Sequence, residues 1–377
     1  MFRGFLAILI ATTAFAAIAS YMIARLENDA LEMLAKDSAS IIEHQPRLEE
    51  ALKHLNEVAF FQISRGDSDA TDYLVELFSD DDNLFYQKIE SHSSDELNLD
   101  LNSLVANEDF DWKAIDLSWI RGLMQFDNLH IYKYESFLDH ELGEKQVPQL
   151  VFHFSQAART RLAQGFHLGQ EDQAIEEVTH LAKLAMTTAD EMYLRLAGLM
   201  LRTVHEFIGI VRAKGRKYNP ALLPVTEEDL YQLEWITRGY NRSLGLQAPI
   251  EWLERAPTLA KSPALQCVAI KSAVISAATI APYLEPEYPE HYSIYRKLFE
   301  RWKAPCQMDD IGSFGDVNDI FGEEITKRVI GRSNSWDPAI WIHEFFLKDR
   351  TRRFIGLSVY TTVGPGTLLL PPPDRTH

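Results

Sequence analysis

Glu177 and His180 have the spacing that comes closest to a catalytic motif in this chain of 377 residues. A glutamate three residues before a histidine on one helix is the pattern of carboxylate-bridged di-iron sites. Such a site also needs a second Glu-x-x-His and two further glutamates, and the sequence holds no second copy. We therefore expect neither a metal nor a cofactor, and the sequence assigns no catalytic residue.

His205 and Glu206 could complete such a site only if they lay level with His180. If the chain reverses near residues 188–190, the two histidines differ in height by about 12 Å, because each helical residue rises about 1.5 Å. The same geometry places Glu177 and Arg202 within about 3 Å of one height. We predict a structural ion pair between Glu177 and Arg202.

Searches for other catalytic patterns give no match in the sequence. It lacks Gly-x-Ser-x-Gly, His-Glu-x-x-His, a phosphate-binding Walker loop and Ser-x-x-Lys. Enzymatic activity therefore stays uncertain and is the less favoured reading. The alternative is an enzyme whose site is assembled from dispersed polar residues such as Glu177, His180 and Arg202.

The two cysteines, Cys267 and Cys306, lie 39 residues apart. In an oxidising compartment they could form a single disulfide. Two buried thiols are the other reading, because Cys267 belongs to an apolar segment that favours a packed helix. A zinc site made of cysteine pairs is excluded, because no second pair exists.

Three consecutive segments have the apolar periodicity of helices and position most of these residues. In the second of them, apolar residues recur at i, i+4, i+7, i+8 and i+11, a spacing that predicts one buried stripe. The third is apolar on most sides, which is typical of a central helix. No run of alternating residues indicates a strand, so we expect an all-α fold of antiparallel helical hairpins. The three predicted helices are Gln149–Gln164, Glu171–Thr187 and Met192–Ala213.

The turn between the first two helices resembles a single tetratricopeptide unit. Gly169 stands at the turn, Ala174 follows five residues later, and Val178 and Leu181 follow at nine and twelve. The resemblance covers about 34 residues. It implies tetratricopeptide-like packing of two helices and carries over no functional residues.

The N-terminus has the pattern of an export signal. Arg3 precedes the apolar run Phe5–Ala24, whose twenty residues would span about 30 Å as a helix, enough to cross a bilayer. Ala17-Ile18-Ala19 also fits a cleavage site. We favour an uncleaved single-pass anchor with the bulk of the chain outside the cytoplasm, the alternative being a cleaved signal and an exported, periplasmic product.

The formal net charge of −18, from 37 basic and 55 acidic residues, argues against nucleic acid as a partner. Most of this charge lies between Asp67 and Asp116, which hold 15 acidic and 2 basic residues. Within this stretch, Ser91–Glu108 is rich in polar residues and is predicted to be a flexible loop.

These observations divide the chain into four parts. They are a signal-anchor or signal peptide (1–26), an N-terminal helical region with the acidic loop (27–147), a helical core (148–360) and an extended tail (361–377). Because no catalytic spacing accompanies the export signal, we expect a helical scaffold of the cell envelope. We expect it to bind a protein or peptide, and to meet the membrane through its N-terminal segment.

Overall fold

The computed structural model describes residues 2–63, 66–78, 100–129, 150–189, 191–243, 250–270 and 289–306. Within these ranges the chain is helical and has no strand; Asp69 and Asn128 form an isolated bridge. The prediction of an all-α fold is confirmed for this part of the chain. The predicted tail and the helices expected after residue 306 lie outside the described residues.

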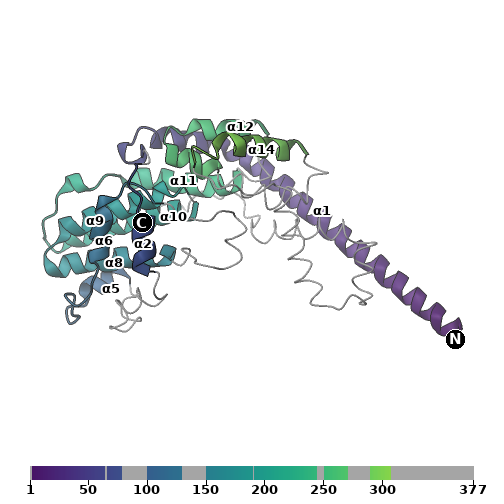
Figure 1. Cartoon of the computed structure of the whole chain (residues 1–377), viewed down its shortest axis with the longest axis horizontal. Coiled ribbons are helices and arrows are strands. Elements are labelled where there is room, and N and C mark those ends of the chain that lie inside the picture. The colour runs from purple at the N-terminus through teal and green to yellow at the C-terminus, as the bar shows by residue number, and fades with distance from the viewer. Residues whose placement is uncertain are drawn as a thin grey trace.

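A three-helix unit forms the centre of the body. It consists of α8 (Leu150–Leu168), α9 (Glu171–Thr187) and α10 (Glu191–Ala213), each of which packs against the other two. Figure 1 shows the three lying side by side at the end of the body away from the N-terminus. The apolar stripe of α9, including Ala174, Val178 and Leu181, is fully buried. The predicted bounds of α9 are confirmed.

The turn between α8 and α9 lies one helical turn later than the sequence suggested. We expected α8 to end at Gln164, but it continues to Leu168. Gly169 ends it with a φ of +68°, and Gln170 N–H donates to the carbonyl of Gly165 at 2.7 Å. This is a glycine-terminated helix end, because glycine adopts the left-handed conformation without steric cost.

Gly165 is needed inside α8 for a different reason. A Cβ atom at this position would lie 2.5 Å from the Cβ of Ala174 on α9. The absence of a side chain at Gly165 and the small one at Ala174 therefore allow the two helices to approach closely. This contact brings the polar side chains of α8 within reach of those of α9.

Short elements cover the three-helix unit. Asp100 caps α5 by accepting a hydrogen bond from Ser103 N–H at 2.9 Å. Residues 100–106 are therefore ordered as a capped helix, which corrects the predicted flexible loop Ser91–Glu108 in this portion; residues 91–99 lie outside the described set. The elements that pack on it are α5 (Leu101–Ala106), α6 (Ser118–Gly122), η2 (Leu123–Gln125) and η3 (Pro220–Leu222). The other short elements are η1 (Ala59–Phe61) and α2 (Thr71–Phe78).

The longest element is α1 (Phe2–Leu55), a single helix of 54 residues that measures about 80 Å. Its N-terminal half extends away from the other labelled helices, and its C-terminal end lies along α11 and α12 (Figure 1). Pro46 lies inside α1 and does not end it. Among side chains that the structure describes, no helix holds an apolar stretch long enough to cross a membrane. Most side chains of Phe5–Ala24 lie outside that set.

The C-terminal end of α1 docks on α11 (Glu227–Ser243), and α12 (Ile250–Leu259) lies beside it. Leu48, Leu52 and Leu55 are buried there. Polar contacts surround this apolar contact. His54 Nε2 lies 2.6 Å from Asp229 Oδ1, the guanidinium of Arg47 lies over the ring of Trp235, Arg255 pairs with Glu49, and Asn56 Nδ2 donates to the Leu259 carbonyl.

The last described helices join the body beside α12. Residues 263–270 are helical, and α14 (Pro289–Trp302) packs against α12. Ile294, Leu298 and Phe299 form the buried face of α14. The spacing of these three residues places them on one side of the helix, so α14 docks through a small apolar surface.

Candidate functional site

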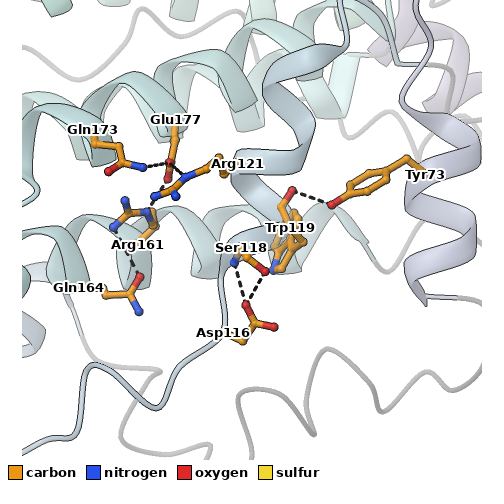
Figure 2. Close-up of polar contacts among 9 residues, drawn as sticks. All are labelled: Tyr73, Asp116, Ser118, Trp119, Arg121, Arg161, Gln164, Gln173 and Glu177. Carbon is orange, nitrogen blue, oxygen red and sulfur yellow. Dashed lines mark hydrogen bonds and ion pairs between the residues drawn. The ribbon is translucent and has the colours of Figure 1, made fainter.

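Glu177 lies at the centre of a buried polar network in the three-helix unit (Figure 2). Its side chain is almost fully buried, with 3% of the residue surface exposed. Arg161 Nε donates to Oε2 at 2.6 Å, while Gln173 Nε2 and Arg121 Nε donate to Oε1 at 2.7 and 3.1 Å. Both carboxylate oxygens of Glu177 therefore already accept hydrogen bonds from neighbouring side chains.

The network connects three separate elements. Arg161 comes from α8, Glu177 and Gln173 stand one turn apart on α9, and Arg121 reaches in from α6. Arg161 is as buried as Glu177, whereas the side chain of Arg121 is 62% exposed. The core contact is thus a buried Arg161–Glu177 ion pair, and Arg121 closes it from the solvent side.

Gln164 extends the network to the segment before α6. Its Nε2 atom donates to the carbonyls of Trp112 and Ile115, both at 2.9 Å. Arg161 Nη1 lies 3.5 Å from Gln164 Oε1. Because carbonyls in an irregular segment have no regular backbone partner, a buried side-chain amide is one way to satisfy them. Gln164 therefore fixes this segment on α8.

The electrostatics of the network keep Glu177 ionised. Burial by itself raises the pKa of the carboxyl, but the hydrogen bond and charge of Arg161, with hydrogen bonds from Arg121 and Gln173, outweigh it. The net result is a lowered pKa. A carboxylate held ionised with both oxygens occupied has no proton to give and no free lone pair aimed at a substrate. The arrangement suits a structural ion pair rather than acid–base chemistry.

His180, three residues further along α9, also contacts the segment around α6. Its Nε2 atom lies 3.1 Å from the Leu123 carbonyl and 3.0 Å from the Phe126 carbonyl. Since carbonyls only accept hydrogen bonds, Nε2 carries the proton. Burial lowers the pKa of His180 more than these two carbonyls raise it. His180 is therefore a neutral donor that holds η2 against α9.

The α6 helix is also held from its other side. Asp116 Oδ1 accepts hydrogen bonds from Ser118 N–H and Ser118 Oγ at 3.0 and 2.6 Å, and Tyr73 Oη donates to the Trp119 carbonyl at 3.3 Å (Figure 2). Arg121 is thus presented to Glu177 by a helix fixed at both ends. Glu177 of α9 binds Arg121 of α6, and His180 binds carbonyls at both ends of η2. These contacts account for the Glu-x-x-His spacing without a metal.

The predicted Glu177–Arg202 ion pair does not form, because each residue has other partners. Glu177 pairs with Arg161 and Arg121, and Arg202 Nη2 pairs with Glu234 Oε2 of α11. The prediction considered only the relative heights of residues on α9 and α10. It did not include the rotation of α10, which turns Arg202 toward α11 and solvent.

His205 and Glu206 have separate structural partners. His205 Nε2 lies 2.9 Å from the Val225 carbonyl, and Glu206 Oε1 accepts a hydrogen bond from Asn102 Nδ2 of α5 at 2.8 Å. Among the described residues, no group of three or more histidine, cysteine, aspartate or glutamate side chains could hold a metal ion.

The structure joins Cys267 and Cys306 in a disulfide. Their Cα atoms lie 5.2 Å apart, within the usual range for this bond. Of the two readings that the sequence left open, the structure has the bridge. It links the helical residues 263–270 to the end of α14.

Sequence reasoning missed Arg161, Arg121 and Gln164. The available signal was that Arg161 and Gln164 stand one turn apart and flank the apolar pair Leu162-Ala163, since unpaired charges are rarely buried. The sequence offered no way to choose their partners. No protein-family model matches the chain, and neither a curated protein nor a solved structure is significantly similar to it. Function is therefore argued from the geometry.

Proposed function

We propose that this chain is a membrane-anchored helical scaffold of the cell envelope that binds a protein or peptide partner. The helical body carries the binding surface, and α1 connects it to the membrane. The tetratricopeptide-like resemblance of α8 and α9 belongs to this proposal, and the close approach of Gly165 and Ala174 supports it.

The observation that carries the proposal is the length and direction of α1. The apolar run Phe5–Ala24 belongs to the half of the helix that extends from the body. In this run Ile18, Tyr21 and Met22 are 57–68% exposed, and three such side chains within about one turn favour a lipid or protein environment over water. From Ala24 to the buried Leu48 the helix rises about 36 Å.

A second feature favours a scaffold over an enzyme. The dispersed site of the alternative reading would use Glu177, His180 and Arg202. Each has its own intramolecular partner in the structure, and the first is sealed in the core. Contacts within the fold account for all three side chains. The enzyme alternative is therefore left without the residues on which it was based.

Membrane insertion can be tested with one substitution and its matched control. Phe15→Arg places a charge in the middle of the apolar run, where it would cost about 3 kcal/mol in a bilayer; Phe15→Leu keeps the segment apolar. With a reporter after His377 that is active only outside the cytoplasm, we expect activity for wild type and Phe15→Leu and a marked loss for Phe15→Arg. Equal activity in all three would refute the anchor.

Partner binding needs a separate test. Full-length protein solubilised in detergent from envelope membranes is expected to retain a stoichiometric protein partner. That partner, purified, should bind the full-length protein again in a direct titration. A full-length protein that purifies alone and turns over a small molecule would favour the enzyme alternative.

A further inference from the structure

The Cys267–Cys306 disulfide is completely enclosed by the folded body. Cys267 is 2% exposed and Cys306 is 0% exposed. Neither sulfur can therefore meet an external reagent while the surrounding helices are in place, because thiol–disulfide exchange requires direct attack on an accessible sulfur.

Cys306 follows α14, the helix that packs against α12. Cys306 continues the helical hydrogen bonding of α14, with its N–H donating to the Trp302 carbonyl at 2.9 Å. Cys306 therefore moves with this helix. Cys267 belongs to residues 263–270, a different segment of the chain. In the folded body the bridge joins these two segments.

We propose that the bridge is made by exchange with an external disulfide, in an oxidising compartment, while α14 is undocked. One cysteine thiolate attacks the external disulfide, which gives a mixed disulfide and releases one thiol. The second cysteine thiolate then attacks the protein sulfur of the mixed disulfide and releases the second thiol. The two cysteines lose two electrons, which reduce the external disulfide, and their two protons end on the released thiols.

This order has a structural reason. If α14 docked first, both thiols would be buried, and burial in apolar surroundings makes a thiol inert toward external reagents. Oxidation would then wait for α14 to open. Oxidation before docking tethers α14 near its site and makes docking an intramolecular step. The inference rests on the proposed export, because cytosolic reductants keep such thiols reduced.

Refolding in two arms tests the order of events. Full-length protein in detergent is unfolded, reduced and returned to native buffer. In the first arm oxidised glutathione is present from the start, and in the second it is added after helicity has recovered. Bridge formation is followed by mass after each sample is quenched in denaturant with maleimide, which labels buried as well as exposed free thiols. We expect at least about tenfold slower oxidation in the second arm, since exchange then requires local opening; equal rates would overturn the proposed order.

A pair of α14 variants links the delay to docking. Leu298 is buried and Glu300 is exposed on the same helix. Leu298→Ala should loosen docking and restore faster oxidation in the delayed arm, whereas Glu300→Ala should behave as wild type. A delay that Leu298→Ala leaves unchanged would contradict the role of α14. The comparison of the two arms in wild type does not depend on either variant.

The state of the cysteines in cells separates this inference from the proposed export. The reporter after His377 gives the location, and maleimide trapping of the same protein in denaturant gives the oxidation state. A cytoplasmic reporter signal would overturn the proposed function itself. An extracytoplasmic signal with two free thiols would overturn only the bridge, and an extracytoplasmic signal with no free thiol supports both.

Discussion

The three-helix unit and the docking site of α1 differ in where their paired polar side chains lie. In the unit of α8, α9 and α10, Arg161 and Glu177 are paired in the core. Where α1 docks on α11 and α12, leucines fill the centre and the polar pairs lie at the edge. His54 there is 38% exposed and Arg255 is 53% exposed.

This difference assigns distinct roles to the two regions. A buried ion pair contributes little net stability against a well-packed apolar pair, but removing one partner leaves an uncompensated charge in the core. It therefore penalises wrong packing of α6, α8 and α9. Pairs at the edge are screened by water and can break at small cost. We infer that separating α1 from α11 costs less free energy than separating the helices of the three-helix unit.

The largest expected effect is in the buried network. Glu177→Ala leaves Arg161 buried without its carboxylate, and we expect a loss of about 3–5 kcal/mol in the free energy of unfolding. Glu176→Ala changes the exposed neighbour on the same helix and should cost less than about 0.5 kcal/mol. Denaturant unfolding of the full-length protein in detergent measures both. Similar losses for the two variants would refute the network.

Loss of the disulfide should give the second largest destabilisation. Replacing Cys267 and Cys306 by alanine opens a loop of 39 residues, and we expect destabilisation of about 2–4 kcal/mol. The loss should be confined to α14 and residues 263–270, with little change in α8–α10. Hydrogen exchange followed by mass spectrometry can localise it. Uniform loss of protection over the whole body would show that the bridge supports the entire fold.

A substitution at His54 tests how much the polar contacts at the edge of the α1 docking site contribute to stability. His54→Ala removes its contact with Asp229, and because that contact is partly exposed we expect a loss of about 1 kcal/mol. Faster hydrogen exchange should appear in α1 near Leu48–Leu55 and in α11, while α9 keeps its protection. Lys53→Ala, at an exposed neighbouring position, is the matched control. A loss as large as that of Glu177→Ala would contradict the contrast between the two regions.

Acidification should weaken the three-helix unit through His180. Because its pKa is lowered in the folded state, the unfolded chain binds a proton more readily once the pH drops below about 6.5. The contribution of His180 is complete above that value and is lost as the pH falls below it. Unfolding at pH 7 and pH 5 should show a smaller decrease for His180→Gln than for wild type. An equal decrease would assign the effect to other groups.

The smallest effect is expected at Arg202. Its pair with Glu234 is exposed on the arginine side, so a double-mutant cycle between them should give a coupling of less than about 1 kcal/mol. The parallel cycle between Arg202 and Glu177 should give none, because the two residues have different partners. Coupling in the second cycle only would restore the pairing predicted from sequence.

Local patterns in the sequence determined the helices of the core. The apolar stripe of α9 predicted this helix, and the helical period of the apolar residues predicted the all-α class. These features depend on neighbours within a few residues, which the sequence displays directly. The close approach of Gly165 to Ala174 has no local signal, because Ala174 lies on another helix.

Only the tertiary structure decided which polar residues meet. The sequence contained Arg121, Arg161 and Arg202 as equal candidates for Glu177, and counting residues from a turn gives height but not the rotation of each helix. Packing of α6 and α8 onto α9 selected the first two and turned the third toward Glu234. The same holds for the cysteines, which lie in two segments that the sequence alone does not bring together.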